Sequence, residues 1–371
     1  MLVGVPKEIK DNEYRVGLVP ATVRELAGRG HRVMVQKDAG VGAGITDADF
    51  VAAGAEILSD AAKIFERAEL IVKVKETLKA ERPQLRRGQI LFTYLHLAAD
   101  REQTEALIAA GVTAIAYETV TDAAGTLPLL TPMSEVAGRM APQIGARLLE
   151  KTSGGRGVLL GGVPGVLPGE VLILGSGVVA TNAAVIAVGL GADVTVVGRN
   201  AQSLLHFAER FGARVRTAFA NAETIEALCR RADLVIGTAM SRGGRAPKLI
   251  SKATVKAMKP GSVIVDVSID QGGVAETSRP TSHSEPTYVV DGVIHYCVPN
   301  IPGAVARTST FALNNATQPY VLALADKGLR ALSDDPGLCN GLNVHAGRLT
   351  YRAVAEALQL PYTPAEAALK T

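Results

Sequence analysis

Residues 170–200, EVLILGSGVVATNAAVIAVGLGADVTVVGRN, constrain the fold of this chain more than any other feature. An apolar run is followed by a glycine turn at Gly175 and Gly177, an alanine-rich segment of helical length with Ala180 at the third small position, and a second apolar run. In dinucleotide-binding βαβ units the first glycine permits the tight turn, and the second lets the backbone approach a pyrophosphate at the helix N-terminus. The order predicts a strand–turn–helix–strand unit with a dinucleotide site at its turn. The alternative is a glycine turn that only packs the helix on the strand.

Short runs rich in Val, Ile and Leu alternate with amphipathic stretches along the chain, which is typical of parallel sheets. We therefore predict an α/β protein with two doubly wound, Rossmann-like domains and an interdomain cleft. The predicted substrate (catalytic) domain comprises residues 1–128 and a tail, residues 306–371, that packs back on it. The predicted dinucleotide-binding Rossmann domain comprises residues 129–305, and residues 131–151 form a long helix that could bridge the two.

The composition excludes several classes of protein. A chain of 371 residues that is 47% hydrophobic and 20% charged is in the globular range and long enough for two domains. The net charge of +3 is small and no basic run is interleaved with aromatic residues, so nucleic acid is not an expected partner. The three cysteines are far apart, which fits a reduced protein without a metal knuckle. Residues 1–10 lack the features of a secretory signal and no apolar run is long enough for a membrane span, so we expect a cytoplasmic protein with no membrane partner.

Four polar residues follow predicted strands: Arg15, Lys75, His96 and Asp270. Ligands of open α/β sheets bind beyond the carboxyl ends of the strands. Two cations for a small carboxylate, a group that titrates near neutrality and a second carboxylate suit hydride transfer to or from a small 2-amino or 2-keto acid. Each residue also has a structural interpretation: a solvated Arg or Lys, a buried structural histidine, and an aspartate that caps a turn.

The chain contains several long and distinctive segments, among them VGVPKEIKDNEYRVGLVP, LFTYLHLAAD, TPMSEVAGRMA, VDVSIDQGG and HYCVPNIPGAVARTSTFALNNATQPY. These segments resemble those of bacterial alanine dehydrogenase, in the alanine dehydrogenase and pyridine nucleotide transhydrogenase family, and the likeness runs from end to end. The resemblance implies an oxidoreductase of L-alanine catabolism, which converts L-alanine reversibly to pyruvate and ammonia with a nicotinamide cofactor. It also implies a homo-hexamer.

The resemblance further implies a role for each matching position. Arg15 and Lys75 would bind the carboxylate and carbonyl of the substrate, His96 would be the acid/base at the carbonyl, and Asp270 would be a second acid/base. The expected cofactor-binding positions, from the glycine turn and from the resemblance together, are Ser134, Gly175, Gly177, Val178, Val179, Gly198, Arg199, Ala239, Met240, Val267, Ser268, Ile269, Asp270, Arg279, Val298, Pro299, Asn300 and Ile301.

The chain departs from the family pattern at Gly198, where the family commonly has an aspartate that binds the ribose of NAD(H). Without this carboxylate nothing repels a 2′-phosphate, and Arg199 follows directly. We therefore expect use of NADP(H) beside NAD(H). The alternative is an Arg199 side chain that points into solvent or stacks on adenine, with NAD(H) retained.

Two further departures lie elsewhere. Some members are said to carry metal ligands at the positions of Ala323 and Lys327, which cannot ligate a divalent ion, so we predict no metal there. The loop 236–249 differs from the usual apolar version and could reshape the adenosine side. Two other functions stay open: a keto-acid reductase or opine-type dehydrogenase with a wider pocket, and a transhydrogenase-like dinucleotide-binding subunit without amino-acid activity.

Overall fold

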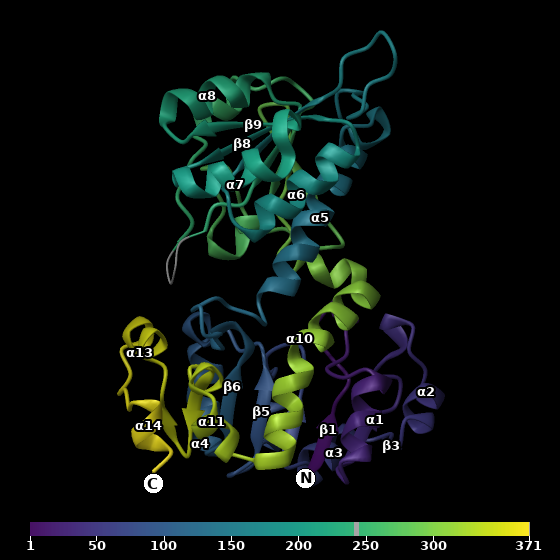
Figure 1. Ribbon diagram of the computed structural model, residues 1–371, viewed down its shortest axis with the longest axis vertical. Coiled ribbons are helices and arrows are strands. Elements are labelled where there is room, and N and C mark those ends of the chain that lie inside the picture. Colours follow the sequence, from purple (N-terminus) through teal and green to yellow (C-terminus); the bar gives the residue numbers. More distant parts are fainter. Residues whose placement is uncertain (241–244, 371) are drawn as a thin grey trace. The chain divides into compact units, whose positions relative to one another are not determined.

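The computed structural model describes residues 1–240 and 245–370, and the chain forms two compact units. Unit 1 comprises Met1–Met133 and Val305–Thr371, and unit 2 comprises Ser134–Ala304. Each unit contains one sheet of mostly parallel strands with helices around it (Figure 1). The predicted α/β class with two Rossmann-like sheets is confirmed, whereas the cleft and the roles of the domains stay predictions.

The sheet of unit 1 has eight strands in the order β15-β14-β6-β5-β4-β1-β2-β3. The strands are β1 (Leu2–Val5), β2 (Arg32–Gln36), β3 (Ala55–Leu58), β4 (Leu70–Val72), β5 (Ile90–Thr93), β6 (Thr113–Ala116), β14 (Leu342–His345) and β15 (Arg348–Leu349). The pairings from β3 to β6 are all parallel, and β14 pairs antiparallel with both β6 and β15. Every residue of β4, β5 and β6 is buried, as expected for central strands covered on both faces.

The helices of unit 1 come from both ends of the chain. They are α1 (Pro20–Gly28), α2 (Asp47–Ala52), α3 (Ala61–Arg67), α4 (Arg101–Ala110), α10 (Ala306–Lys327), α11 (Arg330–Asp334), α12 (Pro336–Cys339), α13 (Arg352–Leu358) and α14 (Ala365–Ala368). A buried hydrogen bond of 2.7 Å from the Thr22 hydroxyl to Asn314 Oδ1 joins α1 to α10. The tail is therefore an integral part of unit 1.

The sheet of unit 2 has seven strands in the order β12-β13-β11-β10-β7-β8-β9. The strands are β7 (Glu170–Leu174), β8 (Asp193–Gly198), β9 (Val215–Phe219), β10 (Leu234–Gly237), β11 (Val263–Asp266), β12 (Thr287–Val290) and β13 (Val293–Tyr296), and only β12 is antiparallel to its neighbour. From β7 the chain first builds outward through β8 and β9, and then returns to add β10 on the other side. This reversal beside β7 is the topological switch point at which open α/β sheets bind ligands.

The helices of unit 2 are α5 (Thr131–Leu148), which begins in the last residues of unit 1, α6 (Val178–Gly189), α7 (Ala201–Phe211), α8 (Ala222–Arg231) and α9 (Lys252–Lys256). Four alanines of α6 are fully buried: Ala180, Ala183, Ala184 and Ala187. Their small side chains let the helix axis lie close to the sheet, which explains why this segment is rich in alanine.

Two strands end earlier than the apolar patterns of the sequence indicate. The pattern LIVKVK, residues 70–75, predicts a strand over its whole length, but the strand ends at Val72. The pattern SVIVDVSID, residues 262–270, likewise forms a strand only to Asp266, after which Val267–Gln271 forms a 3₁₀ helix. The strands β3, β12, β14 and β15 are short, and the sequence patterns did not indicate them.

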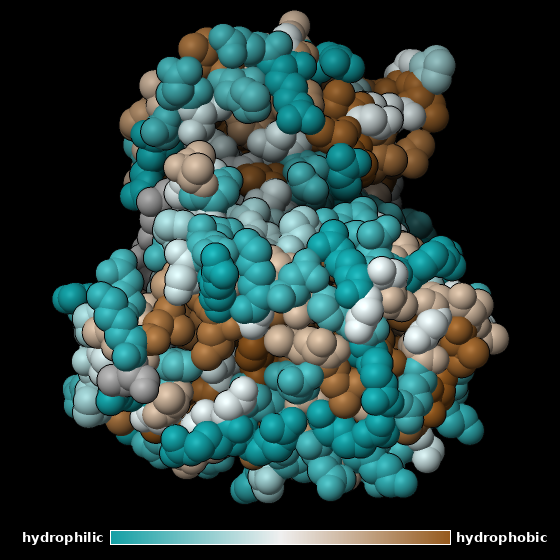
Figure 2. Space-filling model, turned by 60° about the horizontal axis from the view of Figure 1, so that its bottom comes forward, coloured by the Kyte–Doolittle hydropathy of each residue, from teal (hydrophilic) through white to brown (hydrophobic). Residues whose placement is uncertain are grey.

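The face of the molecule in Figure 2 is mostly hydrophilic, with hydrophobic side chains gathered in patches. Leu167, in the loop before β7, is 89% exposed and is the most exposed large hydrophobic side chain of the described residues. No helix within residues 1–240 and 245–370 has both the length and the apolar character that a membrane crossing requires.

Candidate functional site

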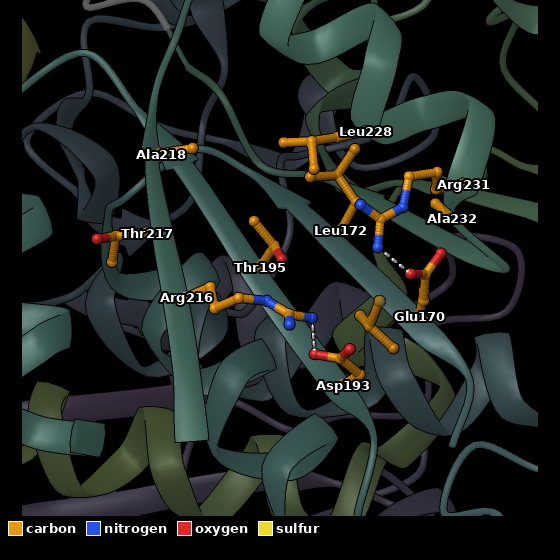
Figure 3. A pocket seen from close by; sticks show the side chains of 11 residues that line it. Glu170, Leu172, Asp193, Thr195, Arg216, Thr217, Ala218, Leu228, Arg231 and Ala232 are labelled. Carbon is orange, nitrogen blue, oxygen red and sulfur yellow. Dashed lines mark hydrogen bonds and ion pairs between the residues drawn. The ribbon is translucent and has the colours of Figure 1, made fainter. Parts of the chain in front are cut away.

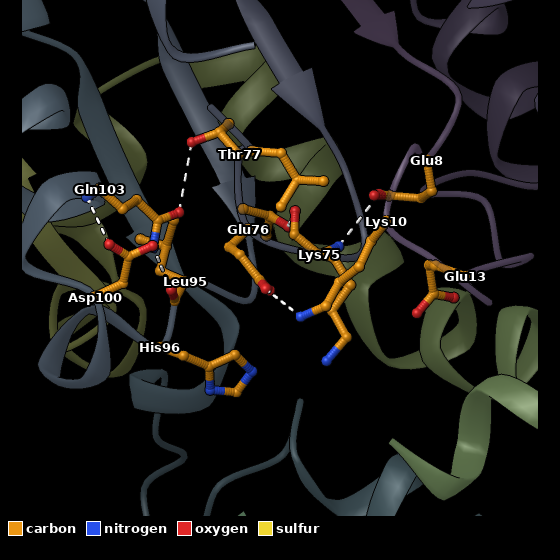
Figure 4. A network of polar contacts seen from close by, with 12 residues as sticks. Glu8, Lys10, Glu13, Lys75, Glu76, Thr77, Leu95, His96, Asp100 and Gln103 are labelled. Atoms are coloured by element: carbon orange, nitrogen blue, oxygen red, sulfur yellow. Dashed lines mark hydrogen bonds and ion pairs between the residues drawn. The ribbon is translucent and has the colours of Figure 1, made fainter. Parts of the chain in front are cut away.

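The carboxyl edge of the unit 1 sheet carries three of the predicted site residues on adjacent strands. Arg15 follows β1, Lys75 follows β4 and His96 follows β5. Hydrogen bonds from Lys73 N–H to the Phe92 carbonyl (3.2 Å) and from Tyr94 N–H to the Val74 carbonyl (3.3 Å) continue the pairing beyond the strand ends. Because the pairing continues, Lys75 and His96 leave the sheet at the same level, and their side chains extend toward the same space (Figure 4).

Arg15 is buried and is held by Glu13. Arg15 Nε donates to Glu13 Oε1 at 2.6 Å and Arg15 Nη2 donates to Glu13 Oε2 at 2.5 Å, while Nη1 lies 3.1 Å from Met133 Sδ. Burial raises the pKa of Glu13, but the hydrogen bonds and charge of Arg15 outweigh this effect and hold that pKa below its ordinary value of 4.5. The bidentate pair fixes the plane of the guanidinium group.

Lys75 is a half-buried cation beside Arg15. Burial, and then the positive charge of Arg15, lower the pKa of Lys75 below 10.5. The Thr93 hydroxyl donates to the Lys75 carbonyl at 2.9 Å, and the Lys75 N–H donates to Glu8 Oε1 at 3.2 Å. Two neighbouring cations, of which Arg15 lowers the pKa of Lys75, form a favourable site for a small carboxylate.

A buried ion triad lies next to Lys75, and the sequence patterns did not indicate it. The fully buried ammonium of Lys73 donates to Glu8 Oε2 at 3.1 Å and to Glu81 Oε1 at 2.7 Å. The other oxygens of these glutamates accept backbone N–H groups on either side of Lys75, at Val74 (2.7 Å) and Leu78 (2.8 Å). The triad therefore fixes the segment that presents Lys75.

His96 has left-handed backbone dihedrals, with φ +52°, and its side chain is 48% exposed. Glu118, after β6, accepts the backbone N–H of His96 at 2.6 Å and that of Leu95 at 3.1 Å. The ring of Tyr94 stacks on the imidazole with centroids 5.9 Å apart, and the Tyr94 hydroxyl donates to the Leu129 carbonyl at 2.6 Å. The imidazole is thus open to solvent and is supported by a carboxylate and an aromatic ring.

The two glycines of the turn after β7 have different physical roles. Gly175 has φ +128°, and a Cβ there would lie 2.3 Å from Thr238 Oγ1, so the protein itself requires glycine. A Cβ at Gly177 would have no atom of the described residues within 4 Å, its two chain neighbours aside. The N-terminus of α6 has no side-chain cap, whereas Asn200 and Asn221 cap α7 and α8. Space at Gly177 beside uncapped N–H donors fits the pyrophosphate of a dinucleotide.

Gly198 is the last residue of β8 and faces the same turn. A Cβ at Gly198 would lie 2.9 Å from Ser176 Oγ, and the following Arg199 is exposed. Asn200 accepts the N–H of Ser203 at 2.9 Å and starts α7. The position at which the family pattern has an aspartate therefore adjoins the glycine turn.

Asp270 lies in the 3₁₀ helix after β11 and is exposed. It is in unit 2 with the expected cofactor positions, whereas Arg15, Lys75 and His96 are in unit 1. Val267, Ser268 and Ile269 share this 3₁₀ helix, while Ala239 and Met240 follow β10.

The remaining cofactor positions lie at the ends of other elements of unit 2. Arg279 lies over the ring of Tyr288, 4.0 Å from its centroid, and His283 Nε2 is 3.2 Å from the Asn300 carbonyl. Val298, Pro299, Asn300 and Ile301 follow β13, Ser134 lies in the first turn of α5, and Val178 and Val179 open α6.

A cavity of about 270 Å³ in unit 2 is not at the carboxyl edge of the sheet. Its lining residues are shown in Figure 3. Glu170 and Asp193 line it at the first residues of β7 and β8, and they form ion pairs with Arg231 and Arg216. Because ligands of parallel sheets bind beyond the carboxyl ends, this cavity is not the candidate cofactor site.

No group of three or more His, Cys, Asp or Glu residues suited to a metal ion occurs within the part of the chain that the structure describes. Ala323 and Lys327 stand where some family members are said to carry metal ligands. Lys327 Nζ is paired with Asp334 at 2.7 Å, and Ala323 offers only a methyl group. The absence of a metal there stays a prediction. Of the unusual loop 236–249, residues 241–244 lie outside the described residues.

Comparisons with known proteins agree with this geometry. Residues 4–137 and 141–352 match the models of the N-terminal and C-terminal domains of the alanine dehydrogenase/PNT family. An alanine dehydrogenase of Halomonas elongata is 58% identical over 98% of this chain and 99% of its own. A solved L-alanine dehydrogenase structure superposes with a TM-score of 0.95 at 54% identity, covering 97% of this chain and 99% of that one.

A transhydrogenase structure from Sinorhizobium meliloti has a TM-score of 0.84 at 23% identity, covering 94% of this chain and all of that one, and shows a shared fold alone. The two domain models together span nearly the whole sequence, and the relative from Halomonas elongata matches almost from end to end. This chain therefore belongs to the alanine dehydrogenase/PNT family.

Proposed function

We infer that this protein is an L-alanine dehydrogenase, an oxidoreductase that converts L-alanine reversibly to pyruvate and ammonia with a nicotinamide dinucleotide. The observation that carries this inference is the set of relatives named alanine dehydrogenase, with 50–58% identity over 98–100% of the chain. The group at the carboxyl edge of the unit 1 sheet supports it, because two cations and an exposed imidazole are the groups that a small 2-keto acid needs.

We propose that unit 1 binds the substrate. Arg15, oriented by Glu13, and Lys75, oriented by the Lys73 triad, would bind the carboxylate and the carbonyl or amine side of pyruvate and alanine. Oriented cations lower the barrier because the reactant needs less reorganisation before it reacts. The lowered pKa of Lys75 supports this role, because a bound carboxylate would offset both the burial and the repulsion by Arg15.

His96 is the proposed acid/base at the substrate carbon. In the direction of deamination, an imidazole nitrogen of His96 would take a proton from the water that adds to the iminium carbon, and would return it as ammonia leaves. A histidine is suited to both directions because its ordinary pKa is near neutrality. Asp270 is proposed as the second acid/base, which exchanges a proton with the substrate amine.

Unit 2 is the proposed cofactor domain. Gly175 and Gly177 and the uncapped first turn of α6 would hold the pyrophosphate, and the segment Val267–Gln271 with Arg279 would line the rest of the site. A nicotinamide held there would supply the hydride acceptor for Cα of L-alanine, and in its reduced form the hydride donor for the reverse reaction. The remaining expected positions, Ser134 and Val298 to Ile301 among them, are proposed to contact the same cofactor.

We further propose that the enzyme uses NADP(H) as well as NAD(H). Gly198 adjoins the glycine turn and carries no carboxylate, and the exposed Arg199 follows it. A carboxylate at this place would repel a 2′-phosphate, whereas a guanidinium group can pair with one. A homo-hexamer in the cytoplasm remains part of the proposal, on the strength of the family resemblance.

The test is the oxidation of reduced cofactor, followed at about 340 nm, with pyruvate and ammonia. We expect ammonia-dependent turnover with NADH and also with NADPH. Turnover that does not depend on ammonia would support a keto-acid reductase, and no turnover would support a dinucleotide-binding subunit without amino-acid activity. A large advantage of NADH in kcat/KM would remove the proposal for NADP(H) and leave the dehydrogenase assignment intact.

A further inference from the structure

A buried carboxylate of unit 2 collects hydrogen bonds from three separate positions of one loop. Asp266, the last residue of β11, has no exposed surface. Its Oδ1 accepts the Ser268 N–H at 3.2 Å. Its Oδ2 accepts the Val274 N–H at 2.7 Å and the Ser278 hydroxyl at 2.5 Å. With a longer contact from the Ala275 N–H at 3.5 Å, four donors in all surround this side chain.

These hydrogen bonds fix both ends of the segment that carries Asp270. Ser268 lies before Asp270 and Val274 after it, so the two oxygens of Asp266 hold the segment at both ends. The Gly273 N–H also donates to the Ser268 carbonyl at 3.0 Å. A Cβ at Gly273 would lie 2.5 Å from Asp266 Oδ2, and the φ of Gly273 is +77°. The loop therefore passes directly over the carboxylate.

The third hydrogen bond, from the Ser278 hydroxyl, links Asp266 to the segment that carries Arg279. Ser278 precedes Arg279, whose backbone N–H donates to the Tyr288 hydroxyl at 2.8 Å and whose guanidinium group lies over the Tyr288 ring. One carboxylate thus ties the Asp270 segment and the Arg279 segment to the end of β11.

Burial raises the pKa of the Asp266 carboxyl above its ordinary value of 3.8, and the hydrogen bonds from Ser278 and the loop N–H groups offset only part of this effect. Among the described residues no ion pair joins Asp266 to a Lys or Arg. The loop N–H groups and the Ser278 hydroxyl are therefore the groups that stabilise its negative charge. Buried charges are tolerated only when such donors are fixed, and fixed donors in turn make the loop rigid.

We propose that Asp266 is a positioning residue for the reaction: it holds the segment Val267–Gln271 so that Asp270 reaches the substrate amine. This inference rests on the proposed function, in which Asp270 is an acid/base. Asp266 itself is buried beneath the loop, and in this proposal it acts only through Asp270.

The main variant is Asp266→Asn, in the full-length protein. The shape is kept, but whichever way the amide turns, its NH₂ group faces a donor, either the Ser268 N–H or the Val274 N–H. We expect kcat to fall about 10- to 100-fold, the range expected for a catalytic group displaced by about 1 Å. KM for pyruvate should stay within about threefold, because Arg15 and Lys75 are in unit 1.

The matched control is Asp233→Asn, at the opposite edge of the same sheet. Asp233 is 6% exposed, its Oδ2 accepts the Glu170 N–H at 2.9 Å, and its Oδ1 pairs with Lys259 at 3.1 Å. This variant should lower the Tm of the protein to a similar extent but leave kcat within about twofold. A loss of kcat only in Asp266→Asn separates positioning from a general loss of stability.

The decisive comparison is the double variant with Asp270→Asn. If Asp266 acts through Asp270, the double variant should be no slower than Asp270→Asn alone, whereas independent effects multiply. Multiplied losses, or a wild-type kcat in Asp266→Asn, would overturn the inference and leave the proposed function standing. Full activity of Asp270→Asn would instead remove the proposed role of Asp270.

If Asp266→Asn does not fold, Ser278→Ala replaces it, since it removes one donor and no charge. A several-fold loss of kcat that disappears in the Asp270→Asn background supports the inference, and a wild-type kcat overturns it.

Discussion

The backbone N–H of His96 donates to Oε1 of Glu118 at 2.6 Å, and this bond holds a histidine in a conformation that non-glycine residues rarely adopt. A left-handed backbone costs about 1–3 kcal/mol for such a residue. Glu118 offsets that cost by accepting two consecutive N–H groups, at Leu95 and His96. The orientation of the proposed acid/base therefore depends on a side chain from the neighbouring strand end.

Glu118→Ala should lower kcat by about tenfold or more, because the two N–H groups lose their acceptor and the His96 turn can relax. Glu118→Gln keeps an acceptor oxygen and should restore most of the activity. The measurement is kcat with pyruvate and ammonia for both variants. A Gln variant as slow as the Ala variant would show that the charge of Glu118 matters, and not its hydrogen bonds.

Gly177→Ala should weaken cofactor binding and leave the fold intact. Within the part of the chain that the structure describes, the added Cβ meets no atom within 4 Å beyond its chain neighbours, but it fills the space proposed for the pyrophosphate. We expect the Kd for reduced cofactor, measured by fluorescence, to rise at least about tenfold, with a change in unfolding free energy below about 1 kcal/mol.

Gly175→Ala is the matched control, because its φ of +128° and the contact with Thr238 Oγ1 should destabilise the protein by about 1–3 kcal/mol. Equal destabilisation by both variants would contradict the assignment of separate roles to the two glycines.

The fold and two of the candidate site residues could be predicted from sequence for a physical reason. A glycine turn and the apolar strands depend on neighbours close in the chain, so Gly175, Gly177 and the strand β7 leave a local pattern. Lys75 and His96 were likewise indicated because polar side chains directly after apolar runs stand out.

The residues that orient Lys75 and His96 leave no local pattern in the sequence. Glu118 is 22 residues from His96, and nothing near Glu118 in the sequence separates it from a solvated glutamate. Glu8 and Lys73 are 65 residues apart and meet only because β1 and β4 are neighbours in the sheet. Asp266 is local to its loop, but its role depends on the early end of β11, which the apolar run 262–270 conceals.

Lys75 predicts a dependence of substrate binding on pH. Burial, and then the charge of Arg15, lower the pKa of Lys75 below 10.5, and only the ammonium form attracts a carboxylate. KM for pyruvate should therefore be constant at lower pH and rise as the pH increases through this lowered pKa. The measurement uses a fixed concentration of unprotonated ammonia at each pH.

In Lys75→Arg the group stays charged over the whole range, so the alkaline rise in KM should disappear even if KM itself is higher. A rise of the same size in this variant would assign the titration to another group.

Gly198→Asp should shift the cofactor preference of the enzyme toward NAD(H). The new carboxylate would accept the ribose hydroxyls and repel a 2′-phosphate, so the ratio of kcat/KM for NADPH to that for NADH should fall at least about tenfold. The Cβ of the new residue would lie 2.9 Å from Ser176 Oγ, 3.0 Å from Ser176 Cβ and 3.1 Å from Leu204 Cδ2, so Ser176 Oγ must rotate and the turn must shift by a few tenths of an ångström. Arg199→Gln is the companion variant and should lower only the value for NADPH. An unchanged ratio in both variants would mean that this position does not select the cofactor.

Lys73→Met should lower the unfolding free energy by about 3–5 kcal/mol, because Glu8 and Glu81 would remain buried without their cation. Burial already raises the pKa of Glu8, and loss of Lys73 would raise it further. Since a raised pKa favours the protonated folded form, the deficit relative to wild type should shrink when the pH falls from about 8 to about 5. The triple variant Glu8→Gln, Lys73→Met, Glu81→Gln should recover part of the loss in chemical denaturation. A deficit that grows at low pH would contradict this account.

The pairing of β14 with β6 has a consequence for biosynthesis. All of unit 2 has been translated by residue 304, but the edge of β6 has no partner strand until residues 342–345 have left the ribosome. The nascent chain thus carries an open β edge from the synthesis of β6 until β14 follows, and such edges invite association with other chains. Slow elongation over the tail codons would lengthen this vulnerable interval, so the yield of intact enzyme in the cell depends on how fast its last segment is made.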